Sequence, residues 1–165
     1  MAKDQSFDVV SQVDMQEVDN AVQQASKELT QRYDLKDSGA TITFDRTGST
    51  ISLAAPSDFV LGQVKDVLES KLVRRTIDLK AVSWGKIEAA SGGSSRRTGT
   101  IVNGIEADLA RQMNKDIRDE KFKAKVQIEG DKLRVFSASR DELQAVIGFL
   151  KEHDYGIPLQ FINYR

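Results

Sequence analysis

The sequence contains no cysteine and only one histidine, His153, among its 165 residues. The lack of cysteine excludes disulfide bridges, thiolate metal sites, iron–sulfur clusters and cysteine nucleophiles. A single histidine excludes histidine-cluster metal sites and disfavours Ser-His-Asp chemistry. No apolar run approaches the roughly 18 residues of a membrane-spanning helix, and the N-terminus lacks the apolar segment of a secretion signal. The sequence therefore predicts a soluble, cytoplasmic protein without a metal ion or cofactor and without a membrane partner.

The chain also lacks an excess of charge of either sign, since 24 basic residues and 25 acidic residues leave a formal net charge of −1. It is not a basic nucleic-acid-binding arm, so any polyanion that it binds must contact a local patch. No set of nucleophile, base and orienting residue can be assembled from the sequence. We therefore expect no catalytic residues, with an unrecognised enzyme as the weakest alternative.

Apolar periodicity and turn residues predict the element order β-α-β-β-α-β twice along the chain. The first half reads as a strand over residues 6–13, a helix capped by Asp14 with an apolar stripe that runs to Tyr33, a hairpin over 40–53, a helix from Pro56 and a strand over 79–89. The second half reads as a strand over 98–102, a helix capped by Asn103, a hairpin over 124–135, a helix capped by Ser139 and a strand over 159–164.

This repeated order predicts an α+β protein with two ferredoxin-like (βαββαβ) domains. Each domain has a four-stranded antiparallel sheet with two helices on one face. The glycine- and serine-rich stretch Ser91–Ser95 predicts a flexible linker between the two halves. The second face of each sheet is left for water, a ligand or a partner.

The two uncovered sheet faces differ in their predicted chemistry. The first hairpin presents small polar residues, namely Thr41, Thr43, Asp45, Thr50 and Ser52. The second hairpin presents basic residues beside an aromatic one, with Lys123 and Lys125 on one strand and Lys132, Arg134 and Phe136 on the other. Such a pattern is typical of RNA-recognition sheets, where cations contact phosphates and bases stack on rings. A solvated face on which Lys and Arg suppress edge aggregation explains the pattern equally well.

Four segments of the chain resemble the bacterial YajQ family, and the resemblance extends over essentially the whole sequence. They are Ser6–Val18, Lys71–Arg75, Ser139–Ile147 and Pro158–Arg165. The resemblance implies two ferredoxin-like domains that exchange their first strands. The N-terminal strand would join the second sheet, and the strand near residues 98–102 would join the first. We accordingly place the first domain at residues 14–102 and the second at 103–165, completed by residues 1–13.

The resemblance also implies a nucleotide-binding protein without an assigned enzymatic activity, with RNA, purine nucleotides and cyclic di-GMP as ligands of its members. It carries no ligand motif, so the candidate residues come from the open-face pattern. They are Lys123, Lys125 and Arg134 for phosphate, Arg140 on the next helix, Phe136 for stacking, and Phe161, Asn163 and Arg165 on the final strand. The face on which Phe161 lies stays open, and core packing is preferred for it if Tyr164 is exposed.

We expect the ligand on the open face of the second sheet or between the domains. Lys and Arg would hold its phosphate, and an aromatic ring would stack on its base. The alternative is a protein–protein adaptor that uses the open sheet faces, which the neutral face of the first domain suits better than RNA.

Overall fold

The computed structural model describes residues 4–165, which form two compact units. One unit is Val13–Val102, and the other joins the segment up to Gln12 with Asn103–Arg165. No helix within residues 4–165 is both long and apolar enough to cross a bilayer.

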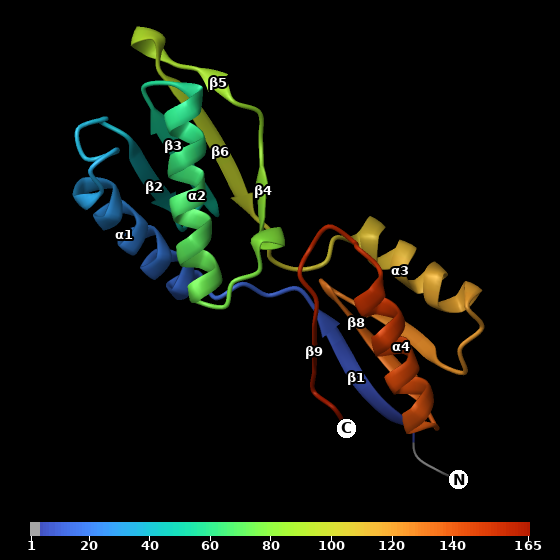
Figure 1. Cartoon of the computed structure of the whole chain (residues 1–165). Coiled ribbons are helices and arrows are strands. Elements are labelled where there is room, and N and C mark those ends of the chain that lie inside the picture. The colour runs from blue at the N-terminus through green and yellow to red at the C-terminus, as the bar shows by residue number, and fades with distance from the viewer. Residues whose placement is uncertain (1–3) are drawn as a thin grey trace. The chain divides into compact units, whose positions relative to one another are not determined.

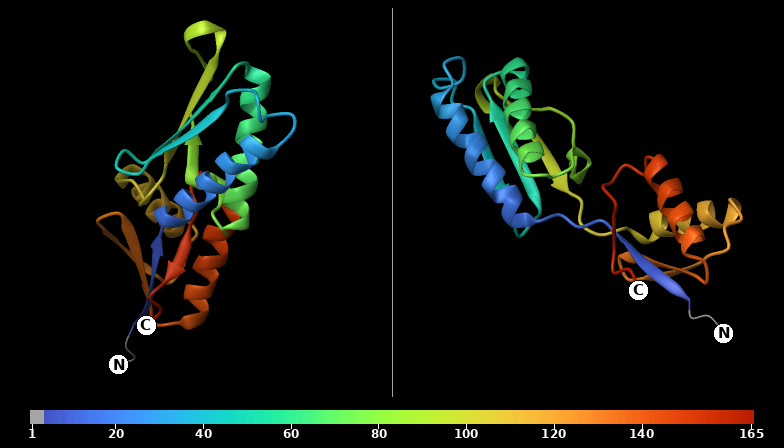
Figure 2. Two further views of the ribbon diagram at one scale, coloured as in Figure 1. Left: turned by 90° about the vertical axis from the view of Figure 1, so that its left-hand side faces the viewer. Right: turned by 60° about the horizontal axis from the view of Figure 1, so that its bottom comes forward.

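The unit Val13–Val102 contains two long helices that lie side by side over one face of a sheet (Figures 1 and 2). The strand order is β2-β3-β6-β4, with β5 also paired to β6. The elements are α1 (Met15–Gln31), β2 (Thr41–Asp45), β3 (Thr50–Ala55), α2 (Asp58–Arg74), η1 (Leu79–Ala81), β4 (Val82–Trp84), β5 (Glu88–Ala89), η2 (Ser91–Gly93) and β6 (Ser95–Ile101).

The other unit repeats the arrangement with a sheet of strand order β7-β8-β1-β9, in which every pairing is antiparallel. Its elements are β1 (Gln5–Val10), α3 (Ala107–Asp119), β7 (Lys125–Glu129), β8 (Lys132–Ser137), α4 (Arg140–Glu152) and β9 (Gln160–Ile162). The predicted fold of two ferredoxin-like domains is confirmed.

The two units exchange their first strands, as predicted, and the partners of β1 and of β6 confirm it. Strand β1 pairs with β8 and β9 of the C-terminal unit, although the chain then continues into α1 of the other unit. Strand β6 pairs with β3 and β4 before the chain returns to the C-terminal unit. Each exchanged strand is therefore central in its sheet, and each core depends on a strand from the other part of the sequence.

Each unit has its own apolar core between helices and sheet, built from the predicted helical stripes. Two apolar residues differ from the prediction. Val13 packs on the core of the first unit instead of extending β1, because the chain changes units at this point. Tyr33 is 89% exposed, because α1 ends at Gln31 and its stripe does not reach that far.

Two of the three predicted helix caps are confirmed, and one is not. Asp14 and Ser139 accept backbone N–H groups of the first turn, and Ser57, beside the predicted start at Pro56, does the same for α2. Asn103 does not cap a helix, because α3 begins only at Ala107. The backbone N–H groups of Gly104 and Ile105 donate instead to the carbonyl oxygens of Ser11 and Asp131.

The predicted flexible linker Ser91–Ser95 is instead the turn of a hairpin within the first unit. Gly92 and Gly93 adopt positive φ values of 72° and 77°, which glycine tolerates at no steric cost. The N–H of Ala90 donates to the carbonyl oxygen of Ser94 at 2.8 Å, and β5 pairs with β6. The single strand predicted over residues 79–89 is correspondingly divided into η1, β4 and β5.

Candidate functional site

The uncovered face of the second sheet carries a row of four residues on four neighbouring strand segments. Lys125 lies opposite Phe136, and Phe136 lies opposite Ser6. Ser6 and Arg165 exchange two backbone hydrogen bonds of 3.2 and 3.0 Å. Residues directly opposite one another in an antiparallel pair project to the same face. These four residues, Lys125, Phe136, Ser6 and Arg165, are called the Phe136 row, in which one aromatic ring lies between two cations.

The two cations of the Phe136 row are available to a ligand. Lys125 and Arg165 are exposed, and within residues 4–165 neither side chain forms an ion pair. Three strand spacings of about 4.8 Å separate them, or roughly 14 Å across the sheet. Phe136 is half-buried and lies beside the small, buried Ser6. The row therefore offers two charges and one stacking surface.

The neighbouring row is centred on a buried acid, Asp8 of β1, which is only 1% exposed. Arg134 Nε donates to Asp8 Oδ1 at 2.8 Å, and Asn163 Nδ2 donates to Oδ2 at 2.8 Å. Lys132 Nζ lies 3.4 Å from the same Oδ2. Burial raises the pKa of the Asp8 carboxyl, but the hydrogen bonds from Arg134, Asn163 and Lys132 outweigh it and lower the pKa to about 2. Asp8 is therefore ionised at neutral pH.

The network around Asp8 changes the interpretation of two predicted phosphate contacts. Besides Asp8, Arg134 has the carboxylate of Glu129 3.5 Å from its Nη2 atom. Its guanidinium thus lies between two carboxylates, and the pKa of Arg134 is raised by the hydrogen bond to Asp8. Asn163 adopts φ 58°, a left-handed conformation that asparagine tolerates, and its amide points to Asp8. Arg134 and Asn163 lie on the predicted face, but the side chains of both donate hydrogen bonds to Asp8 instead of being free for a ligand.

Three other predicted residues lie outside the Phe136 row. Lys123 precedes β7, where its N–H donates to Glu142 Oε2 at 3.0 Å and its carbonyl oxygen accepts from Ser137. Phe161 lies on the final strand as predicted, but its ring faces the helix-covered side, 6.0 Å from the ring of Phe7. Arg140 is the first residue of α4 and belongs to no strand.

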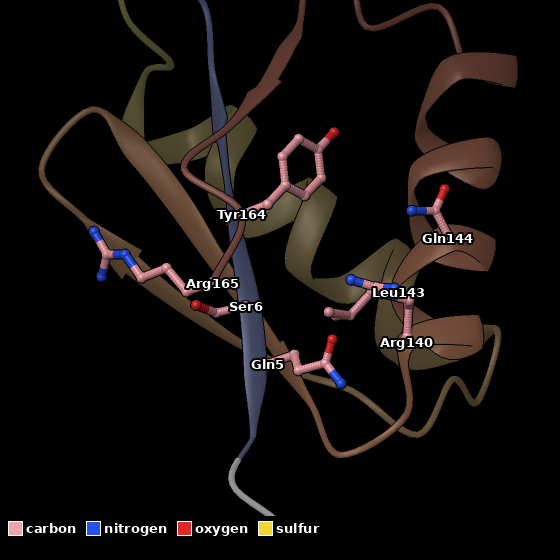
Figure 3. Close-up of a pocket in the computed structure, with 7 residues that line it drawn as sticks. All are labelled: Gln5, Ser6, Arg140, Leu143, Gln144, Tyr164 and Arg165. Atoms are coloured by element: carbon pink, nitrogen blue, oxygen red, sulfur yellow. The ribbon is translucent and has the colours of Figure 1, made fainter.

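A pocket of about 410 Å³ lies on the helix-covered side of β1, beside the first half of α4 (Figure 3). In Figure 3 the side chains of Ser6 and Arg165 point to one side of β1, whereas those of Gln5 and Tyr164 point to the other. The lining residues are Gln5, Ser6, Arg140, Leu143, Gln144, Tyr164 and Arg165, called the Tyr164 pocket below. The pocket brings together two predicted residues, Arg140 and Arg165, although the side chain of Arg165 points to the other side of β1 from that of Tyr164.

Sequence reasoning did not single out Asp8, Gln5 or Tyr164. Asp8 reads as one polar residue in an alternating strand, and no local signal shows that three donors from distant segments surround it. Gln5 and Tyr164 stand at opposite ends of the chain, so only the pairing of β1 with the C-terminal segment brings them into one pocket. Within residues 4–165, no cluster of three or more acidic or histidine side chains is suited to hold a metal ion.

Comparison with known proteins adds to this geometry. The sequence model of the family described as "Nucleotide-binding protein YajQ-like" matches residues 5–165. The chain belongs to this family. It is 48% identical over 165 residues to a protein of Alkaliphilus oremlandii, with all of both chains covered. It is 49% identical over 160 residues to a protein of Acidithiobacillus ferrooxidans, which covers 97% of this chain and 98% of the relative.

A cyanobacterial relative extends the comparison. The protein of Synechococcus elongatus is 46% identical over 165 residues, again with both chains covered in full. All three relatives are named nucleotide-binding proteins. The similarity extends over the residues of both sheets.

Proposed function

We propose that the protein binds nucleotides or single-stranded RNA on the uncovered face of its second sheet, without catalysing a reaction. The observation that carries this proposal is the Phe136 row, in which Phe136 lies between the exposed cations Lys125 and Arg165. The names of the relatives support the ligand class.

The chemistry of the row assigns a role to each member. Lys125 and Arg165 donate charge-assisted hydrogen bonds to phosphate oxygens. A base stacks on Phe136, which contributes about 1–3 kcal/mol per base. Arg134 and Lys132 contribute little attraction for phosphate, because Asp8 and Glu129 neutralise them. They hold β8 against β1 and so fix the position of Phe136 beside Ser6.

A titration tests the proposal. Labelled oligouridine, GTP and cyclic di-GMP are added separately to the purified protein at two salt concentrations. We expect at least one of them to bind, with affinity that falls as salt rises. For single-stranded RNA the double variant Lys125→Ala/Arg165→Ala removes two phosphate contacts, so the slope of log K against log salt becomes shallower by about 1.4.

A matched control removes two exposed cations elsewhere in the same unit. The double variant Lys115→Ala/Arg118→Ala changes the net charge equally, but these residues lie on α3. It should leave the salt slope unchanged. Equal slopes for the wild type and the Lys125→Ala/Arg165→Ala variant would overturn the site, and no binding of any of the three ligands would overturn the function.

The adaptor alternative rests on the open face of the first sheet. Its register places a set of hydroxyl side chains there: Thr41, Thr43, Thr50, Ser52, Ser83, Thr98 and Thr100. Asp45 of β2 lies opposite Thr50 on the same face, and Arg96 and Glu88 form an ion pair of 2.9 Å. A face with so little charge would bind a protein partner with little dependence on salt, which distinguishes it from phosphate binding.

A further inference from the structure

The Tyr164 pocket has one aromatic wall and an apolar base. Tyr164 is 59% exposed, and its ring is supported by Phe7, with the two ring centroids 6.1 Å apart at an interplanar angle of 34°. Leu143 of α4 is 5% exposed and supplies apolar surface on the helix side. A flat ring placed here would contact the face of an anchored aromatic side chain, a geometry that favours stacking.

The polar lining of the pocket comes from two amides and one cation. Gln5 lies on β1 and Gln144 on α4, so the two amides approach from different elements (Figure 3). Each amide offers both donors and an acceptor. Arg140 is exposed, and within residues 4–165 its guanidinium has no carboxylate partner in an ion pair. The N-cap oxygen of Ser139 is used by the N–H of Glu142 at 3.3 Å.

We infer that the Tyr164 pocket binds a nucleoside monophosphate. The base stacks on Tyr164 above Leu143, its polar edge meets the amides of Gln5 and Gln144, and its phosphate accepts hydrogen bonds from Arg140. The pocket volume of about 410 Å³ is within the range of roughly 300–1,000 Å³ typical of small-ligand sites. A single unpaired cation suits one phosphate group rather than a polyphosphate.

This inference rests on the proposed function for its ligand class but concerns a separate site. The Phe136 row and the Tyr164 pocket lie on opposite sides of β1, because Ser6 and Gln5 project in opposite directions. Ser6 and Arg165 belong to both sets, so the variants that separate the sites are those of Lys125 and Phe136 for the row and of Arg140 and Tyr164 for the pocket.

The experiment titrates the full chain with 5′-AMP and 5′-GMP by calorimetry, with adenosine and guanosine as phosphate-free probes. The variant Arg140→Ala should weaken monophosphate binding about tenfold and leave nucleoside binding unchanged, because it removes a charge-assisted contact to phosphate only. Tyr164→Ala should weaken all four ligands about tenfold, whereas Tyr164→Phe should keep the stacking and bind like the wild type.

Two matched controls check that the effects belong to the pocket. Tyr33→Ala removes another exposed tyrosine, and Arg118→Ala removes another exposed arginine, both away from the pocket lining. Neither should change monophosphate affinity. Wild-type protein that binds no monophosphate, or monophosphate binding that Arg140→Ala and Tyr164→Ala both leave unchanged, would overturn the inference.

A cross-test separates the two sites. The variant Lys125→Ala/Phe136→Leu should leave monophosphate affinity unchanged. A loss of monophosphate affinity in this variant would assign monophosphates to the Phe136 row and overturn the inference. If oligouridine binds with the predicted salt slope and no monophosphate binds, the proposed function is supported and the inference about the pocket is overturned. If monophosphate binding depends on Arg140 and none of oligouridine, GTP and cyclic di-GMP binds in a way that depends on Lys125 and Phe136, the pocket is supported and the Phe136 row is overturned.

Discussion

The two sheets share one strand order but differ in what their exchanged central strands contribute. In the first sheet, β6 places Gly99 under the helices, and Trp84 of the neighbouring strand lies opposite it. In the second sheet, β1 places Val9 opposite Phe161 of the neighbouring strand, and Phe7, two residues earlier on the same face, is fully buried against its own core. Both central strands thus meet a large aromatic neighbour, but the first does so with a glycine, whereas the second does so with a valine and adds the large buried Phe7.

The uncovered faces differ in the same way. Strand β6 presents Thr98 and Thr100 there, whereas β1 presents Ser6 and the buried Asp8. The hydroxyl face needs no internal partners, but the acid of β1 requires three donors around it. The two exchanged strands thus add different chemistry to faces of the same strand order: hydroxyl groups in the first sheet and a buried acid in the second.

Among the substitutions that distinguish the two faces, Asp8→Ala should lower the free energy of unfolding the most. The change leaves Arg134 and Lys132 without their buried partner, so the free energy of unfolding should fall by about 3 kcal/mol. Urea unfolding followed by far-ultraviolet circular dichroism measures it. The control Asp119→Ala removes an exposed acid at the end of α3 and should stay within about 0.5 kcal/mol of the wild type. Equal stability of the two variants would show that the Asp8 network is not structural.

Gly99→Ala tests the core of the first sheet. A Cβ atom at residue 99 would lie 2.5 Å from Val82 Cγ1 and 2.9 Å from Trp84 Cε3. Val82 is β-branched and buried, so relief requires a backbone or ring shift that costs about 2 kcal/mol. The fluorescence of Trp84, the single tryptophan, should change at the same time.

The matched control for Gly99→Ala is Gly62→Ala in α2. A Cβ atom at residue 62 meets nothing within 4 Å, so the variant should be more stable by about 0.5–1 kcal/mol. A destabilised Gly62→Ala protein, or an unshifted Trp84 spectrum in Gly99→Ala, would contradict this account of the first core.

Acid should weaken the second sheet through Asp8. Its pKa is about 2 in the folded protein, against an ordinary value of 3.8. Because the folded pKa is depressed, ionised Asp8 stabilises the fold above the ordinary value, and this contribution is lost as the pH falls through the folded pKa. The stability advantage of the wild type over Asp8→Asn should shrink by about 1 kcal/mol between about pH 6 and about pH 3. An advantage that is constant over this interval would contradict the assignment.

The smallest expected effect comes from Thr98→Val on the first sheet. The substitution keeps the β-branched shape and removes one exposed hydroxyl, so the free energy of unfolding should change by less than about 0.5 kcal/mol. Binding of oligouridine should be unaffected. Weaker RNA binding by Thr98→Val, measured in the same titration as the wild type, would move the nucleic-acid surface to the first sheet.

Local signals in the sequence were sufficient for the order of elements. Asp14 and Ser139 mark the starts of α1 and α4, because their side chains accept backbone N–H groups of the first turn. Apolar stripes of helical period identify the buried faces of the helices. The same logic failed at Ser91–Ser95, because a glycine-rich stretch has the same composition in a linker and in a hairpin turn. It failed at Asn103 because the bonds of Gly104 and Ile105 to distant carbonyl groups delay the start of α3.

The sequence by itself determined two βαββαβ units, their helical faces and a basic, aromatic hairpin in the second unit. Only the tertiary structure decided which cations are free for a ligand. Arg134 and Lys125 look alike in the sequence, but Asp8 approaches Arg134 from a strand 126 positions away. Likewise, Gln5 and Tyr164 share a pocket because β1 pairs with the last residues of the chain. Such contacts depend on strand pairing between distant segments, which no local pattern encodes.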